Sequence, residues 1–418
     1  MTITMPPKRL SKLALQVLAC TSCALLAQSA QSHTDSSPAT SSTKASTHQP
    51  QTTVNGALQV TYRTDDSTSQ NLWQIPGILL GGEAHGYERG PALDSANLTI
   101  RHVHDNGLYG VIEIGSHSHD GEAEVEFEEV LVGYHLPLPE QNATAVFEAG
   151  HLNARFSPFN HQHANEKASS EDHLAYAAFF GGHFTDNGLR AHLTHDSGWT
   201  LGIEAWQGNE YPGDGTHAAV DGYVHYELNQ DKWKTNAGIW AFQTQSEVRT
   251  DQRQTGHSHG TPAKTDTSSV QYGGDSVVFG AFAQLDWNFA EDWHWQTEAE
   301  WLAYSERGDI RDESRLAGLK GDYTAGRIYS ALRYNKQQIG VQYERLSLKN
   351  HLSGSAGPLI AASAGLLNPG QDPEKTTISY NWFAHQNLLV RLEWIYNRTE
   401  LQSNPYAALG LVWHSRLY

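Results

Sequence analysis

The segment VVFGAFAQLDWNF, residues 277–289, decides the fold that this sequence predicts. Its odd-numbered positions, from Val277 to Phe289, all hold apolar side chains, whereas the even-numbered positions include Gln284, Asp286 and Asn288. Successive side chains of a β-strand point to opposite faces of the sheet. One face of this strand therefore suits lipid and the other suits water. The next run, residues 293–301, repeats the pattern with three tryptophans on one face.

Sixteen runs of this kind follow one another from Val54 onward, and the connections between them alternate in length. Short connections are expected at residues 105–107, 137–142, 195–198, 229–233, 290–292, 335–337 and 385–387. Longer ones are expected at residues 64–93, 157–184, 207–215, 249–272, 306–321 and 349–375. Outer-membrane barrels have short turns on one side and long loops on the other, whereas a soluble β-sandwich has no reason to sort its loops. The sequence therefore predicts an all-β fold, a transmembrane antiparallel β-barrel of about 16 strands with a porin-like plan.

The first thirty residues have the pattern of an export signal. A basic start is followed by an apolar run over residues 13–26 and by small residues at 27–30, as in cleaved secretory signals. An alternative is a lipoprotein signal that ends at Cys20. Residues 31–53 are rich in Ser, Thr, Gln and His and are expected to form a disordered linker. The predicted organisation is a signal peptide at 1–30, a linker at 31–53 and a barrel at 54–418, located in the outer membrane of a Gram-negative cell and in contact with its lipid.

Composition excludes several classes of function. The hydrophobic fraction is 39% and the mean hydropathy is −0.53, and the sequence holds no run of about 20 apolar residues that would form a membrane helix. A formal net charge of −18 argues against nucleic acid as a partner. We find no nucleophile elbow, His-Glu-x-x-His motif or phosphate loop, so no enzymatic activity is expected.

Alternation along the strands places many carboxylates inside the predicted barrel. The expected cation path consists of Glu113, Glu124, Glu126, Glu148, Glu298 and Glu300. An acidic, water-filled channel attracts cations and repels anions because low-dielectric walls concentrate the field. The alternative is that these groups form an ion-paired and hydrogen-bonded filling of a closed barrel.

Histidines at a spacing of two residues recur in the regions that should lie on the long-loop side. Residues two apart on an extended chain point the same way, so both imidazoles of a pair could reach one cation. Carboxylates stand close to two of the three pairs, and mixed imidazole and carboxylate ligands suit zinc. The alternative for each pair is a solvated loop histidine. The predicted metal ligands are His117, His119, Asp120, Glu122, His161, His163, Glu166, Asp172, His173, His257 and His259.

Four stretches in order carry a resemblance to a known family: residues 75–84, 124–130, 149–163 and 185–189. Together they resemble a family of bacterial zinc-regulated outer-membrane receptors or porin-like channels, often labelled TonB-dependent. The resemblance implies a role in zinc acquisition, with zinc as a transported or loosely bound ion and no organic cofactor.

The number of expected strands bears on how such a channel would work. TonB-dependent receptors have a plugged barrel of about 22 strands, whereas only the linker at residues 31–53 precedes the first strand here. TonB coupling is therefore not expected, and passive passage is. The overall plan also resembles general porins, which implies a possible homotrimer.

Together these observations predict an outer-membrane channel for uptake of zinc or other divalent cations. One rival is a general diffusion porin whose histidines are incidental. The other is a sealed, metal-binding surface receptor in which residues 157–184 fill the pore.

Overall fold

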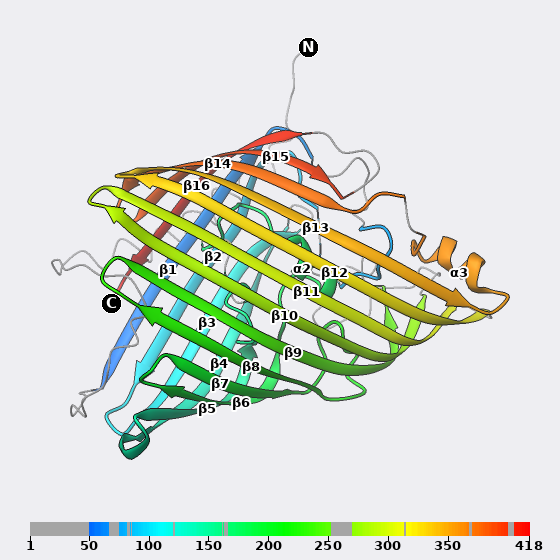
Figure 1. Ribbon diagram of the computed structural model, residues 1–418, viewed down its shortest axis with the longest axis horizontal. Coiled ribbons are helices and arrows are strands. Elements are labelled where there is room, and N and C mark those ends of the chain that lie inside the picture. The colour runs from blue at the N-terminus through cyan, green and yellow to red at the C-terminus, as the bar shows by residue number, and fades with distance from the viewer. Residues whose placement is uncertain are drawn as a thin grey trace, which may run out of the picture.

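The computed structural model describes residues 50–66, 75–81, 84, 86–119, 122–160, 162, 166–251, 270–312, 315–367, 370–399 and 405–418, with the backbone alone at 117–119 and 122–124. These residues form a closed barrel of sixteen antiparallel strands in which each strand pairs with its neighbours in sequence and β1 pairs with β16 (Figure 1). The predicted fold class and strand number are confirmed. The predicted signal peptide and nearly all of the linker lie outside the described residues.

The strands are β1 (Gln51–Arg63), β2 (Gly90–Val103), β3 (Leu108–His119), β4 (Glu122–Leu138), β5 (Ala143–Asn153), β6 (Thr185–His195), β7 (Trp199–Trp206), β8 (Ala219–Asn229), β9 (Trp233–Thr250), β10 (Gln271–Ala290), β11 (Trp293–Asp312), β12 (Arg315–Tyr334), β13 (Gln337–Ser353), β14 (Glu374–His385), β15 (Leu388–Arg398) and β16 (Tyr406–Arg416). In the part of the chain that the structure describes, the connections contain the short α-helices α2 (Leu174–Phe180) and α3 (Gly357–Ser363) and the 3-10 turn η1 (Pro139–Gln141). Among the described residues, no helix has the length and apolarity needed to cross a membrane.

The outer face of the barrel is apolar where the alternation predicts it. On β10, Phe279 is 55% exposed while its neighbour Val278 is fully buried, and on β11 Trp301 is 51% exposed while Glu300 is 4% exposed. A closed barrel leaves no strand edge unpaired, so every backbone group at membrane depth is satisfied by a neighbouring strand. The exposed apolar side chains therefore form the lipid-facing surface.

The sorting of short and long connections is also confirmed, with two exceptions on the long-loop side. One is the connection from β3, which ends at His119, to β4, which begins at Glu122. The predicted long loop at 306–321 is wrong, because β11 runs on to Asp312 and β12 begins at Arg315. Beyond the lipid-facing part, outward side chains such as Arg307 are polar while inward ones such as Ile310 are buried. Both faces of this extension lie outside the bilayer, so the apolar alternation that marks a membrane strand fades although the ladder continues.

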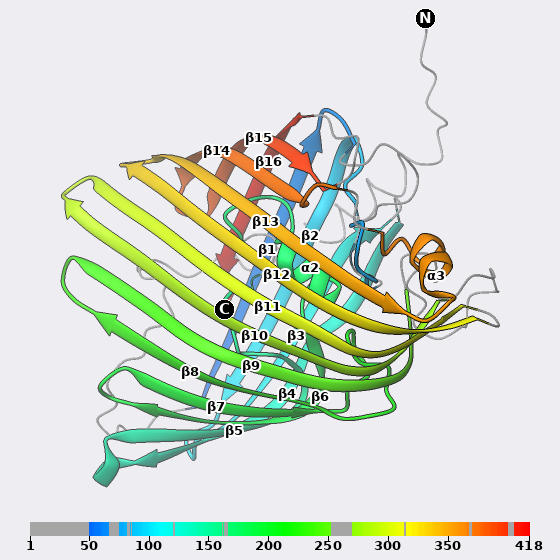
Figure 2. The same cartoon turned by 45° about the vertical axis from the view of Figure 1, so that its right-hand side comes forward.

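Two long connections fold into the barrel instead of projecting from it. We call residues 154–184, which link β5 to β6, the inserted segment. All seven residues of α2 within it are buried, and Ile75, Ile78 and Leu80 of the first long connection belong to the same apolar cluster. Figure 2 shows α2 enclosed by the strands, and it contacts β12 and β13.

Candidate functional site

The inserted segment is held in the lumen by an apolar core of a kind more typical of a soluble domain. Phe180 packs against Phe156 and Phe242, with ring centroids 5.4 and 5.5 Å apart. Phe179 lies edge-on to Tyr304, at 5.2 Å. Phe242 belongs to β9 and Tyr304 to β11, so inward-facing aromatic residues of the barrel wall complete the core. Because each buried aromatic ring removes a large apolar area from water, this side of the segment is firmly anchored.

Carboxylates of the barrel wall bind polar groups of the same segment. Glu300 on β11 accepts hydrogen bonds from the Ser157 hydroxyl at 2.7 Å and from the Tyr176 hydroxyl at 2.8 Å. Glu344 on β13 accepts a hydrogen bond from the backbone N–H of Leu174, the first residue of α2, at 2.6 Å. Hydrogen bonds to an ionised acceptor are about twice as strong as neutral ones. These two wall carboxylates therefore position the helix.

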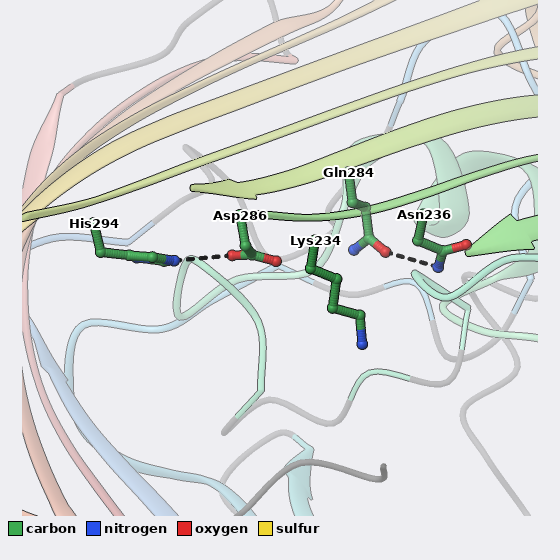
Figure 3. A pocket seen from close by; sticks show the side chains of 5 residues that line it. All are labelled: Lys234, Asn236, Gln284, Asp286 and His294. Atoms are coloured by element: carbon green, nitrogen blue, oxygen red, sulfur yellow. Dashed lines mark hydrogen bonds and ion pairs between the residues drawn. The ribbon is translucent and has the colours of Figure 1, made fainter. Parts of the chain in front are cut away.

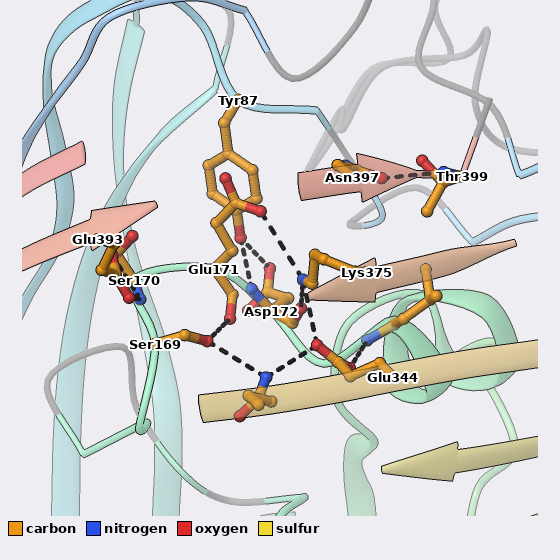
Figure 4. Close-up of polar contacts among 12 residues, drawn as sticks. Tyr87, Ser169, Ser170, Glu171, Asp172, Glu344, Lys375, Glu393, Asn397 and Thr399 are labelled. Atoms are coloured by element: carbon orange, nitrogen blue, oxygen red, sulfur yellow. Dashed lines mark hydrogen bonds and ion pairs between the residues drawn. The ribbon is translucent and has the colours of Figure 1, made fainter. Parts of the chain in front are cut away.

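A second group of polar contacts joins residues 167–173, which we call the latch, to the strands near the barrel closure (Figure 4). Glu393 on β15 accepts a hydrogen bond from the Ser170 N–H at 3.0 Å. Lys375 on β14 donates to the carbonyl oxygen of Asp172 at 2.6 Å, and its ammonium lies 3.7 Å from the Glu171 carboxylate and 3.4 Å from that of Glu344. Lys375 is 4% exposed, so these interactions are little screened by water.

Further contacts close the latch on the side of β1 and β16. The Glu171 carboxylate lies 3.8 Å from the guanidinium of Arg63 and accepts a hydrogen bond from the Tyr406 hydroxyl. The Tyr87 hydroxyl donates to the Asp172 carboxylate at 3.0 Å. Burial raises the pKa of Glu171 above its ordinary value, and the nearby positive charge of Lys375 offsets part of that shift. The latch and α2 are thus bonded to β1, β11, β13, β14, β15 and β16. At the start of the inserted segment, the Arg155 N–H donates to Glu204 on β7, and the Phe156 carbonyl oxygen bonds to His225 on β8.

The predicted metal ligands that the structure describes do not assemble into a site. His173 is 2% exposed, and its Nε2 lies 3.4 Å from the Gln162 side-chain oxygen. Burial and the nearby charge of Arg327 hold the pKa of His173 well below its ordinary value. Glu166 is exposed, and the Asp172 carboxylate is bound by Tyr87. Within the described residues, no group of three or more His, Cys, Asp or Glu side chains could hold a metal ion.

The remaining predicted ligands cannot be placed as side chains. His161, His163, Asp120, His257 and His259 lie outside the described residues. Only the backbone is described for His117, His119 and Glu122, where β3 and β4 pair so that His117 stands opposite Glu124 and His119 opposite Glu122. The metal-binding role of all these residues therefore stays a prediction.

Three members of the predicted cation path are already engaged inside the barrel. Glu148 accepts hydrogen bonds from the Tyr109 hydroxyl and from Arg190, both at 2.5 Å. Glu298 forms an ion pair with Arg327 at 2.7 Å, and Glu300 holds the inserted segment as described above. The contacts of these three glutamates are those of an ion-paired and hydrogen-bonded filling of the lumen, which is the alternative that the sequence left open.

The wall formed by β3 and β4 carries the other carboxylates. Glu113 and Glu126 face the interior, as their alternation predicts, and Glu113 is 7% exposed. A β-bulge shifts the register here, so that both Glu128 and Glu129 also turn inward, and Glu128 accepts a hydrogen bond from Asn97 at 3.0 Å. The side chain of Glu124, also predicted on this path, is not described. Two consecutive inward glutamates could not be predicted from a strict period of two.

Carboxylates outnumber bases throughout the interior. Among the described residues, thirteen Asp or Glu but only six Lys or Arg side chains are buried. A negative excess inside low-dielectric walls lowers the energy of a cation in the remaining space.

A polar cavity lies between β9, β10 and β11 near the short turns (Figure 3). Its volume is about 400 Å³, and its lining comprises Lys234, Asn236, Gln284, Asp286 and His294. The Asn236 amide donates to Gln284 at 3.1 Å, and His294 lies 3.3 Å from Asp286. All five side chains sit on lumen-facing positions, so the lumen near the short turns is lined by polar groups.

Sequence comparison gives no assignment, because neither a protein-family model nor a curated protein matches this chain. Solved structures do match in fold. The outer membrane channel DcaP of Acinetobacter baumannii is 9% identical with a TM-score of 0.53, covering 88% of this chain and 97% of that one. A loop L8 deletion mutant of OmpT, an outer membrane protein of Vibrio cholerae, is 10% identical with a TM-score of 0.51, covering 88% and 100%. The fold is therefore that of the porin-like β-barrels of the Gram-negative outer membrane.

Proposed function

We propose that this protein is an outer-membrane channel that favours small cations, and that they pass along the wall of β3 and β4. The observation that carries the proposal is the set of four inward glutamates on these two strands, Glu113, Glu126, Glu128 and Glu129. The described bonds of the latch and of α2 go instead to β1, β11 and β13–β16. The latch and α2 are thus bonded to that side of the wall, and in this proposal the ions pass on the side of β3 and β4.

Selectivity follows from the geometry of such a constriction. A cation beside several carboxylates in a narrow, poorly screened space is stabilised, whereas an anion is repelled. The polar cavity at Lys234 and Asp286 would receive the ion on the side of the short turns, where its mixed charges and amides allow it to leave.

The test is the reversal potential of the purified barrel in a planar bilayer under a salt gradient. The triple substitution Glu113→Gln, Glu126→Gln and Glu128→Gln is expected to reduce the preference for cations, because it removes charge without changing side-chain size. Glu291→Gln is the matched control, since Glu291 is exposed in the short turn between β10 and β11. Unchanged selectivity in the triple variant would reject the proposed path.

We further propose that zinc is among the transported cations. Support comes from the histidine pairs and from the family resemblance of the sequence. Replacement of His117, His119, His161 and His163 by alanine is expected to weaken zinc binding and growth under zinc limitation. If zinc binding and growth both stay unchanged, the proposed role in zinc uptake is rejected, and the protein would be a general porin that favours cations.

A homotrimer is also proposed, on the likeness of the overall plan to that of general porins. The mass of the protein in detergent, measured by light scattering with the detergent contribution subtracted, distinguishes one copy, 46.2 kDa with the predicted signal peptide included, from three. A single copy at all protein concentrations would contradict the proposal.

A further inference from the structure

Buried polar atoms without a hydrogen-bond partner gather between the latch and the strands that close the barrel, β15, β16 and β1. Among the described residues, they include the hydroxyls of Thr61 and Ser170 and Nη1 of Arg391. All three side chains are at most 3% exposed. Unpartnered polar groups are rare inside native proteins, and each one indicates a bound water or ion, or local strain.

A glycine leaves a space between two of these groups. Gly410 on β16 is buried and pairs directly with Thr61 on β1 and with Arg391 on β15. A Cβ added to Gly410 would lie 3.4 Å from the Thr61 hydroxyl oxygen and 3.6 Å from Cβ of Arg391. These are ordinary van der Waals distances, so a space the size of a methyl group remains above the glycine. We call this space the Gly410 hollow.

The latch borders the Gly410 hollow on the long-loop side. The Ser170 N–H donates to Glu393, and the Ser170 carbonyl oxygen accepts a hydrogen bond from Arg63 at 3.3 Å. Glu393 and Arg63 both pair with Ala408, so Ser170 lies over Ala408 (Figure 4). Ala408 is two positions from Gly410 and points to the same face of the sheet. The Ser170 hydroxyl therefore lies next to the hollow.

The guanidinium of Arg391 indicates which ligand the hollow suits. Its Nε–H donates to Asn381 on β14 at 3.3 Å, and Nη2 donates to the Lys167 carbonyl oxygen at 2.8 Å. In a guanidinium, Nη1 lies on the opposite side of the Nε–Cζ bond from the Nε–H, so Nη1 points away from β14 and toward β16. Within the described part of the chain, Arg391 forms no ion pair with a carboxylate. Glu393, two positions along the same face, is bonded to the latch instead.

Three hydrogen-bond donors beside one small space fit a monovalent anion. A chloride ion accepts several hydrogen bonds and is close in size to a methyl group. A water molecule would satisfy the two hydroxyls, but it would leave the buried charge of Arg391 without a counter-charge, which is strongly destabilising. A dianion is disfavoured because the carboxylate of Glu393 lies close by.

We propose that a monovalent anion of the size of chloride binds in the Gly410 hollow and joins the latch to the barrel wall. Ser170 donates to the anion from the latch, while Thr61 and Arg391 donate from β1 and β15. Release of the latch then breaks bonds to the anion, so the bound anion stabilises the docked inserted segment. This inference does not depend on the proposed cation passage, which follows β3 and β4.

The test uses the full chain in neutral detergent and measures the rate of trypsin cleavage after Lys167, which belongs to the latch. Chloride is titrated against gluconate at constant ionic strength. An anion that binds only the docked latch lowers its release by a factor of 1 + [L]/Kd, so chloride at about ten times its Kd should slow cleavage about tenfold. Bromide should act as chloride does, and sulfate at the same ionic strength should not.

Two variants locate the effect. Gly410→Ala places a methyl group in the hollow without a clash and should abolish the dependence on chloride. Gly326→Ala on β12 is the matched control, because a Cβ there has no other atom within 4 Å, and it should respond as the unmodified protein does. Thr61→Val keeps the side-chain size, removes one donor and should weaken the response several-fold. Heat-dependent migration on a gel shows which variants fold, and Thr61→Val decides if Gly410→Ala does not.

Three results would overturn the proposal. Equal cleavage of the unmodified protein at every chloride concentration would mean that the hollow holds water only. An undiminished chloride response in the deciding variant would place the anion elsewhere. An equal effect of sulfate would reduce the response to general screening by salt.

Discussion

Replacing Lys375 by methionine is expected to loosen the latch without unfolding the barrel. The ammonium of Lys375 donates to the Asp172 carbonyl oxygen and lies 3.4 and 3.7 Å from the carboxylates of Glu344 and Glu171. Methionine keeps the length of the side chain but leaves both carboxylates without this counter-charge. Glu171 would retain Arg63, and Glu344 would retain its hydrogen bond from α2.

The magnitude follows from the burial of the group. Removing one partner of a buried ion pair costs about 3–5 kcal/mol, and the remaining partners of Glu171 and Glu344 place the expected cost near the lower end, about 3 kcal/mol. Each 1.4 kcal/mol is a factor of ten in an equilibrium constant. The equilibrium constant for release of residues 167–173 from the wall should therefore increase about 100-fold.

Single-channel recording in a planar bilayer measures this release as brief openings to a higher conductance. Lys336→Met is the control, because Lys336 is exposed in the short turn between β12 and β13, and it should behave as the unmodified protein. Heat-dependent migration on a gel reports separately that the barrel is intact. If Lys375→Met leaves conductance and opening frequency unchanged while the barrel remains folded, the latch does not limit passage and the reasoning fails.

Three other substitutions examine separate parts of the account. Phe179→Ala should lower the free energy that holds the inserted segment in the lumen by about 3–5 kcal/mol, because Phe179 is fully buried. Protease cleavage within residues 154–184 should therefore rise. Equal resistance to protease would contradict the anchoring role of the buried aromatic residues. Ile239→Arg should destabilise the barrel by about 2–4 kcal/mol in lipid, because Ile239 is 63% exposed on the outward face of β9 and lies six residues from the start of that strand; unfolding in urea measures the loss, and no change would place Ile239 off the lipid face. Burial would raise the pKa of Asp214, but hydrogen bonds from Thr216 and Val248 hold it below its usual value. The stabilisation from Asp214 is therefore complete above the unfolded-state pKa of about 3.9 and is lost as the pH falls through the lower folded-state pKa. Lowering the pH should then increase pepsin cleavage within residues 207–218 of the unmodified protein. The increase should be smaller in the Asp214→Asn variant.

The barrel could be predicted because the sequence pattern that specifies it is local and is repeated in every strand. The alternation in residues 277–289 assigns each side chain to a face, and Phe279 and Val278 lie on the faces it predicts. The alternation of short and long connections predicts the direction of each strand. The extension of β11 and β12 was missed because both of its faces lie outside the bilayer, where lipid no longer imposes an apolar face.

The arrangement inside the lumen depends on contacts between distant residues and could not be predicted in the same way. Ser170 meets Glu393 across 223 positions, and no local pattern specifies that pairing. One local signal was present: the run LAYAAFF at residues 174–180 is apolar yet lies in a connection. In a connection exposed to water such a run would be costly, which indicates a segment that packs inside the barrel.

The most direct test of cation preference is the reversal potential of the unmodified protein in a planar bilayer that separates concentrated from dilute potassium chloride. A channel lined by Glu113, Glu126, Glu128 and Glu129 should pass potassium more readily than chloride, so the dilute side should become positive. A negative dilute side would show preference for anions and contradict the account. Stable insertion without any current would contradict it as well, and would mean that the inserted segment seals the barrel.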